Sequence, residues 1–211
     1  MKIIVQQFSH DVRLHERLKF GLQSNSSWNR LRVFIGSRGL WFTLCYRIIY
    51  FSTNNKNIRN LAWWIARLLE IPASCYKTAI CKSDVLGDCV IEQGVYLPDR
   101  GYLTCGALSI GSGSIIHDHI TFGMAVANRN SGRPRVGKNV WIGPNSIVAG
   151  GIEVGDGCTI LPGTYLTYNI PTNTVVRGNP ARVIHENFDN SEIRSSLAII
   201  ENITPQEKAK A

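Results

Sequence analysis

A period of six residues organises the hydrophobic positions of the second half of the chain. Counted from Val136 in steps of six, every position is aliphatic, and a glycine often follows directly. We call these positions rungs: Val136, Ile142, Val148, Val154, Ile160 and Leu166. The upstream rungs are Val85, Ile91, Leu97, Leu103, Ile110, Ile116 and Phe122. A period of six fits neither an α-helix nor a simple hairpin sheet, and it predicts a parallel β-helix.

In the left-handed form of this repeat, three hexads make one triangular turn. The prediction is therefore an all-β core, a parallel β-helix over residues 79–184, behind an α-helical N-terminal region. One extra residue precedes Ile110 and eight extra residues precede Val136. With these insertions allowed for, Leu97, Ile116 and Ile142 should stack on one another. The longer insertion predicts a loop at 128–135, rich in arginine and turn-forming residues.

Residues 1–78 have a different pattern and are predicted to form the helical N-terminal region. Helices are expected at 31–51 and 57–72, and neither is predicted to span a membrane, because arginines interrupt the first and the second is too short. The aromatic residues of this region are Trp41, Phe42, Trp63 and Trp64. They are interpreted either as a cap on the β-helix core or as an interfacial surface facing anionic lipid headgroups. Residues 185–211 are predicted to be a polar tail with one short helix.

Composition narrows the class of protein. With 44% hydrophobic and 18% charged residues, the chain of 211 residues is neither disordered nor a protein with many membrane spans. Its net charge of +8 indicates an anionic partner, either nucleic acid, a membrane surface or a phosphorylated ligand. The first residues lack the apolar core of a secretory signal, which predicts a cytoplasmic protein. Six cysteines show no zinc-ligand spacing, which predicts buried free thiols and no metal.

The stretch SIIHDHITFG interrupts the apolar pattern with His117, Asp118 and His119. The predicted stacking puts these three residues on one corner of the β-helix with Asp99 and Pro144, and we call this group the HDH corner. Histidine suits a general base near neutral pH, and a carboxylate beside it can fix its tautomer and stabilise the imidazolium. The alternative is a solvated surface cluster without catalytic chemistry.

The closing part of the repeat, from VGKNVWIG to NPARVI, resembles the hexapeptide-repeat acyltransferases. The resemblance covers residues 85–184 and includes an Ile-Pro at 170–171 and the segment GNPAR at 178–182. The helical N-terminus leading into IEQGVYLPDRG resembles the serine acetyltransferase branch, which includes many enzymes of capsule, exopolysaccharide and lipopolysaccharide assembly. The resemblance implies a left-handed β-helix, a homotrimer and acetyl-CoA as co-substrate.

The chain departs from that family at the usual histidine positions. Asp99 stands where a catalytic histidine commonly follows Leu-Pro, and Asp118 stands at a second frequent histidine position. Met124 replaces the histidine of the galactoside acetyltransferase branch. We therefore predict His117 or His119 as the base, with Asp99 and Asp118 as supporting carboxylates. Trp141 matches a position that lines the acceptor site in the galactoside branch.

Basic residues were expected to gather around the 128–135 loop and the last coils. They are Arg129, Arg133, Arg135, Lys138, Arg177 and Arg182. The resemblance assigns coenzyme A contacts to Pro162, Thr167, Tyr168 and Arg182, with Tyr168 in place of a common lysine. Arg135 and Lys138 are added as phosphate ligands, and Arg133 joins Trp141 as an acceptor ligand. Nucleic acid is not predicted, since no recognition motif is present.

The predicted function is acetyl-CoA-dependent O-acetyl transfer to a sugar hydroxyl of a bacterial surface polysaccharide. The acceptor is a carbohydrate or a lipid-linked sugar, and peripheral contact with the inner face of the membrane stays open. One alternative is serine O-acetyltransferase, against which the missing histidine beside Pro98 argues. A second alternative is a catalytically silent trimeric scaffold.

Overall fold

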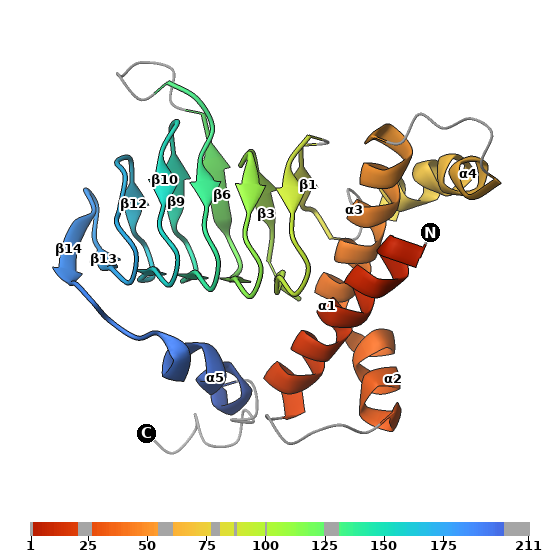
Figure 1. The fold of residues 1–211 in the computed structure, drawn as a ribbon, viewed down its shortest axis with the longest axis horizontal. Helices are drawn as coiled ribbons and strands as arrows, with labels where there is room; N and C mark the ends of the chain where they lie inside the picture. Colours follow the sequence, from red (N-terminus) through yellow and green to blue (C-terminus); the bar gives the residue numbers. More distant parts are fainter. Residues whose placement is uncertain are drawn as a thin grey trace.

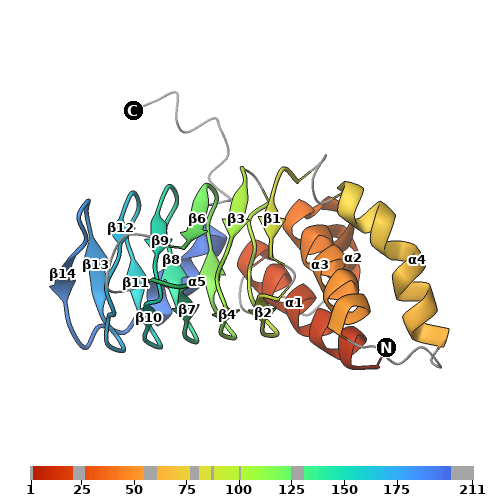
Figure 2. The same cartoon turned by 90° about the horizontal axis from the view of Figure 1, so that it is seen from above.

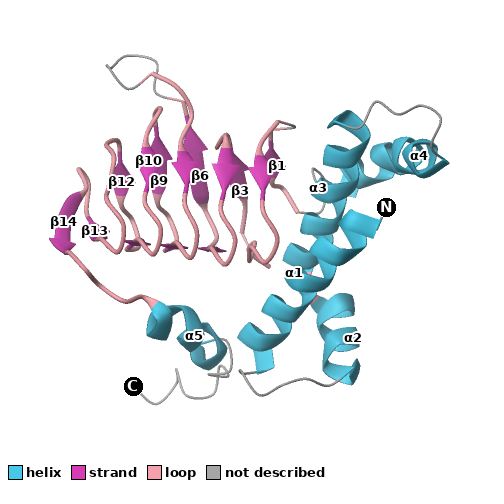
Figure 3. Cartoon of the chain, viewed as in Figure 1, coloured by secondary structure: helices cyan, strands magenta, loops and turns pink. Residues whose placement is uncertain are grey.

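The computed structural model describes residues 2–20, 27–54, 61–76, 81–86, 88–99, 101–124 and 131–200. A β-helix forms one end of the molecule and helices α1 to α4 form the other, as the secondary-structure colours of Figure 3 show. The helices are α1 (Lys2–Phe20), α2 (Ser27–Gly36), α3 (Arg38–Asn54), α4 (Leu61–Cys75) and α5 (Ser191–Ile200).

Three sheets build the β-helix (Figure 1). The first sheet contains β1 (Asp84–Val85), β3 (Leu103–Cys105), β6 (Ile120–Gly123), β9 (Ile147–Ala149) and β12 (Tyr165–Leu166). The second contains β2 (Val90–Ile91), β4 (Ser109–Ile110), β7 (Arg135–Val136) and β10 (Glu153–Val154). The third contains β5 (Ile115–Ile116), β8 (Trp141–Ile142), β11 (Thr159–Ile160), β13 (Val175–Arg177) and β14 (Arg182–His185). All pairs are parallel except β13 with β14, so the predicted parallel β-helix is confirmed.

The rungs form the core of the β-helix. All thirteen are buried, because each side chain points inward from a short strand and meets the rung of the next coil. Ile116 lies opposite Ile142, and Tyr96 bridges to Ile115 one residue earlier, so the predicted stacking of Leu97, Ile116 and Ile142 is confirmed. Five of the six cysteines are buried thiols as predicted, whereas Cys75 is exposed.

The helical region differs from the prediction in two ways. Residues 2–20 form α1, a helix that the pattern did not predict, and the helix expected at 31–51 is divided at Ser37. Gly36 ends α2, and the Ser37 hydroxyl accepts a hydrogen bond from the Leu40 amide at 3.2 Å as the cap of α3. Glycine favours helix ends and serine favours helix starts, which explains the break.

Buried charges attach the helices to the first coil. Arg47 of α3 and Asp11 of α1 form a two-pronged ion pair, with Nε to Oδ2 at 2.7 Å and Nη2 to Oδ1 at 3.1 Å. Both side chains are almost completely buried. The Asp11 carboxylate also accepts from the Gly94 amide at 2.7 Å, and Arg47 donates to the carbonyls of Ile91 and Glu92. One buried pair therefore joins α1, α3 and the turn after β2.

The segment after β14 returns along the outside of the third sheet to the helices. Asn190 donates from Nδ2 to the carbonyls of Asn139 at 2.8 Å and Cys158 at 3.3 Å. Beyond it, α5 packs against α1, which Figures 1 and 2 show at the helical end of the β-helix. None of the helices in the described residues is long and apolar enough to cross a membrane.

Candidate active site

The HDH corner forms as predicted from the stacking of coils. It lies where the third sheet turns into the first, and backbone hydrogen bonds hold it to the coils on both sides. The His117 amide donates to the Ile142 carbonyl at 3.1 Å, and the His119 amide donates to the Tyr102 carbonyl at 2.8 Å. The corner is thus fixed by the same ladder that builds the core.

His119 forms a histidine–carboxylate pair with its neighbour. Its Nδ1 lies 3.1 Å from Oδ2 of Asp118, and its side chain is 38% exposed. The backbone of His119 has a φ of 58°, a left-handed conformation that is uncommon outside glycine. The Tyr102 ring stands edge-on to the imidazole with centroids 4.7 Å apart. This arrangement leaves Nε2 as the nitrogen available to a ligand.

His117 has a drier environment. Its ring lies 4.9 Å from the Trp141 ring in an edge-on contact, so the predicted proximity of Trp141 to the corner is confirmed. Nε2 of His117 and Nε1 of Trp141 are both buried, and neither has a hydrogen-bond partner among the residues that the structure describes. Burial lowers the pKa of His117 below its usual value, and the Asp118 carboxylate only partly opposes this effect. His117 is therefore neutral at neutral pH.

Asp99 contacts the helices, and its role in support of a catalytic histidine stays a prediction. Its Oδ1 accepts from the Ser37 hydroxyl at 2.5 Å and from the Gly39 amide at 2.8 Å, at the start of α3. Its Oδ2 forms an ion pair with Lys19 of α1. A carboxylate at a helix N-terminus meets unpaired amides and the positive end of the helix dipole. These contacts identify Asp99 as an anchor for the helical region.

Arg133 contacts neighbouring coils, and its role as an acceptor ligand stays a prediction. Its guanidinium donates to the carbonyls of Gly106 and Ala107, each at 2.7 Å, and to the Asp88 carboxylate at 2.5 Å. The side chain is 14% exposed. Arg133 thus closes the root of the predicted loop, while Arg129 and the rest of 125–130 lie outside the described residues.

The predicted coenzyme A ligands lie at different corners of one chain. Pro162 follows β11 and shares the HDH corner, since the Gly163 amide donates to Pro144. Thr167 and Tyr168 follow β12 at the next corner, where the Tyr168 hydroxyl donates to the Ala181 carbonyl at 3.2 Å.

The predicted basic cluster is divided in the same way. Arg135 and Lys138, both exposed, lie on β7 and the turn after it, at the second sheet. Arg182 is also exposed, and it lies opposite Arg177 in the backbone register of β13 and β14, at the last coil of the third sheet. The expected single cluster is therefore wrong for the described residues of one chain.

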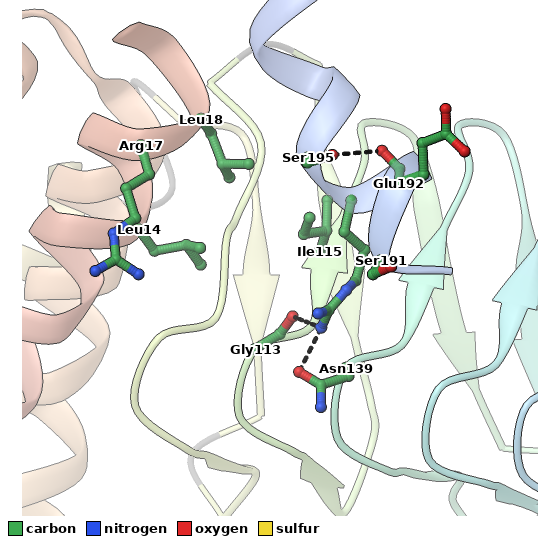
Figure 4. A pocket seen from close by; sticks show the side chains of 10 residues that line it. Leu14, Arg17, Leu18, Gly113, Ile115, Asn139, Ser191, Glu192 and Ser195 are labelled. Carbon is green, nitrogen blue, oxygen red and sulfur yellow. Dashed lines mark hydrogen bonds between the residues drawn. The ribbon is translucent and has the colours of Figure 1, made fainter. Parts of the chain in front are cut away.

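A cavity of about 570 Å³ lies between α1, α5 and the third sheet (Figure 4). Leu14, Leu18 and Ile115 form its apolar wall, and this wall belongs to the same hydrophobic cluster as Trp141. Arg194 crosses its floor and donates to the Gly113 carbonyl at 3.3 Å and to Oδ1 of Asn139. The cavity is thus separate from the HDH corner, and its apolar wall shares a hydrophobic cluster with the tryptophan that contacts His117.

Two residues of the corner were missed by the sequence analysis. Gly101 has a φ of 74°, and a Cβ on it would lie 2.7 Å from Cβ of Asp118 and 2.9 Å from Cε1 of His119. Tyr102 follows it and contacts His119. The glycine lets this turn lie directly against the imidazole. Its place after the Leu-Pro-Asp segment was the only sequence signal for that role.

The hexad β-helix with helices before it is similar in architecture to the class of hexapeptide-repeat transferases. Residues 133–167 match the family model of bacterial transferase hexapeptide (six repeats) proteins. This match covers the later coils of the β-helix.

Curated relatives and a solved structure agree with this class. A chloramphenicol acetyltransferase of Agrobacterium fabrum is 37% identical over 76 residues, 36% of either chain. The putative colanic acid biosynthesis acetyltransferase WcaF of Escherichia coli is 30% identical over 101 residues, which are 43% of this chain and 54% of WcaF. The chain thus spans about half of these relatives or less. The serine acetyltransferase of Neisseria gonorrhoeae superposes with a TM-score of 0.70 at 16% identity, covering 97% of this chain and 72% of that one, and shares its left-handed β-helix fold.

Proposed function

We propose that the protein is an acetyl-CoA-dependent O-acetyltransferase acting on a sugar hydroxyl during the assembly of a bacterial surface polysaccharide. The observation that carries the proposal is the His119–Asp118 pair at a corner that also holds His117 and Trp141. A hydroxyl nucleophile needs a base, and a half-exposed imidazole oriented by a carboxylate is suited to that task. His119 is therefore the proposed base, and Asp118 is its positioning residue.

The proposed reaction needs few groups from the protein. Nε2 of His119 takes the proton of the acceptor hydroxyl while the oxygen attacks the thioester carbonyl. The tetrahedral intermediate collapses, the carbon–sulfur bond breaks, and the imidazolium returns the proton to the leaving thiolate. The products are the acetyl ester and coenzyme A. Alignment of the two substrates supplies much of the remaining rate gain.

A homotrimer is part of the proposal. Pro162, Thr167 and Lys138 lie at three different corners of one chain. Corners of neighbouring chains meet in a threefold assembly, which would bring such groups together around one acetyl-CoA. The separation of these residues within one chain therefore supports a site built between subunits.

The proposed acceptor is a carbohydrate or a lipid-linked sugar. The name of the relative WcaF supports this choice, and Trp141 beside His117 offers an aromatic wall for a sugar ring. The likeness to serine acetyltransferases keeps serine as the second candidate. Asp99 argues against serine, because the position after Leu-Pro is occupied here by a carboxylate that anchors the helices. We place the enzyme in the cytoplasm, with a membrane contact argued in the next subsection.

Release of coenzyme A, followed with a thiol reagent, tests the proposal with serine, nucleotide-sugars, lipid-linked sugars and oligosaccharides as acceptors. His119→Ala should lower turnover about a hundredfold or more, the usual effect of losing a general base. Folding should be unaffected, since the imidazole is partly exposed. His117→Ala serves as the comparison. If both variants keep near-normal rates with a true acceptor, the corner is a surface cluster and the base lies elsewhere. If the wild type releases no coenzyme A with any acceptor, the scaffold alternative gains.

A matched glycine pair tests the position of His119 without removing it. Gly101→Ala places a methyl group against Asp118 and His119, whereas a Cβ on Gly94 would meet no atom within 4 Å. Both glycines have positive φ, so both variants carry similar backbone strain. Gly101→Ala should therefore lose activity beyond any loss in Gly94→Ala. Equal activities would show that the imidazole position does not matter.

A further inference from the structure

Helix α4 has its apolar side turned outward. Trp63, Ala66, Glu70 and Ala73 face α3, where Trp63 donates from Nε1 to the Ser52 carbonyl at 3.2 Å and Glu70 accepts from the Ser52 hydroxyl at 2.9 Å. The opposite side carries exposed Leu61, Trp64, Ile65, Leu68, Leu69 and Ile71, with exposed fractions of 40% to 78%. A helix of a water-exposed surface normally has the reverse arrangement. The outer stripe of α4 is thus a contact surface.

Helix α2 presents a second stripe of the same kind. Trp28 is 62% exposed, Leu31 46% and Ile35 69%, at helical spacings of three and four residues. The guanidinium of Arg32 lies over the Trp28 ring, 5.9 Å from its centroid. In Figure 1, α2 and α4 both lie on the side of α1 that faces away from the β-helix. Exposed tryptophan beside arginine is typical of a membrane interface.

The positive charge of the protein belongs to this helical region. Residues 1–78 contain 12 of the 23 Lys and Arg and 3 of the 15 Asp and Glu, a net charge of +9, while residues 79–211 have a net charge of −1. All three acidic side chains are neutralised within the region: Asp11 by Arg47, Glu16 by Arg30 and Glu70 by Arg67. In the described part of this region, Arg13, Arg17, Arg32 and Arg38 are also exposed, so α1, α2 and α3 present cations to solvent. The basic charge expected at the β-helix loop is centred here instead.

We propose that the helical region docks on an anionic phospholipid surface, with the outer stripe of α4 in the headgroup boundary and the stripe of α2 beside it. This inference rests on the proposed function only for its biological use, the presentation of a lipid-linked acceptor. A second copy of the chain is the less favoured occupant, because joining two α4 stripes would bring two regions of charge +9 together. Anionic lipid supplies the opposite charge. Because α4 is packed on α3, its free side can lie in the interface plane.

Flotation with vesicles of phosphatidylcholine, with and without phosphatidylglycerol, tests this docking. The full chain should float with the mixed vesicles and much less with the neutral ones, and salt should weaken the binding. Trp64→Gln with Leu68→Gln should lower the bound fraction about tenfold by removing apolar contact. The control, Leu86→Thr with Val90→Thr, removes two exposed apolar side chains of the β-helix and should bind as the wild type does.

Two further measurements separate the outcomes. Brominated lipid should quench tryptophan fluorescence, and Trp64→Phe should lower that quenching while keeping the apolar stripe. Trp28 of α2, which is 62% exposed, should account for the quenching that is left. Sedimentation of the α4 variant without lipid should match the wild type. A wild type that does not float with the mixed vesicles would overturn the proposal, and so would an α4 variant that floats as the wild type does. A lower sedimentation mass of the α4 variant than of the wild type would also overturn it, because a second copy of the chain would then cover α4. Acetyl transfer to a water-soluble acceptor is assayed without vesicles, so its result tests the proposed function independently of lipid binding.

Discussion

In the β-helix every coil repeats the same contact, a buried aliphatic side chain on the one before it. The helical region adds to its apolar packing, by Phe42 and Tyr46, polar contacts that each occur once. Arg47 with Asp11, Ser37 with Asp99, and Asp11 with Gly94 connect positions 36, 62 and 83 residues apart. The rungs all make the same kind of apolar contact, and their contributions to the free energy of unfolding add up. A buried ion pair depends on both partners, since either one alone would be an uncompensated charge.

Phe122→Ala should have the largest effect and should act on the β-helix. Phe122 is the largest of the fully buried side chains, so its truncation leaves a cavity and should cost about 4 kcal/mol of unfolding free energy. Denaturant unfolding followed by circular dichroism measures the loss. A change below about 1 kcal/mol would mean that the coil collapses around the gap.

Asp11→Ala should have the next largest effect and should act mainly on the helices. It leaves the Arg47 guanidinium buried and should cost about 3 kcal/mol, the lower end for a broken buried pair, because the Ile91 and Glu92 carbonyls still accept from Arg47. Hydrogen exchange should rise in α1 and α3 while the β-helix stays protected. Uniform loss of protection would show that the two regions unfold as one unit.

The smallest expected effect is a pH dependence that differs between the regions. Burial lowers the pKa of His15 in α1 and of His117 in the β-helix. Below the usual value of 6.5 the unfolded chain binds protons that the folded chain does not, so the free energy of unfolding should fall as pH drops from there. His15→Phe should flatten that slope more than His117→Phe, because His15 is completely buried. Thermal unfolding at a series of pH values checks the order.

The same contrast explains what could be predicted from the sequence. The rungs, their stacking and the place of Trp141 beside the HDH corner follow from a local period, so they were predicted correctly. The contacts of Asp99 and Arg133 were not predicted, because their partners on α1, α3 and the turns of other coils leave no pattern in the neighbouring sequence. Trp63 and Trp64 look equivalent in sequence, yet only the second is exposed, because the first hydrogen-bonds to α3.

The segment after β14 also limits the length of the β-helix. It starts at the last coil, follows the third sheet and ends with α5 on α1. Each coil adds about 4.8 Å to the stack, the spacing of neighbouring strands. An inserted coil would therefore move α5 away from α1 by that distance. A deleted coil would leave the segment between β14 and α5 longer than the distance it has to span. A hexad repeat alone sets no upper limit on the number of coils. In this protein the fixed length of the segment between β14 and α5 sets that number.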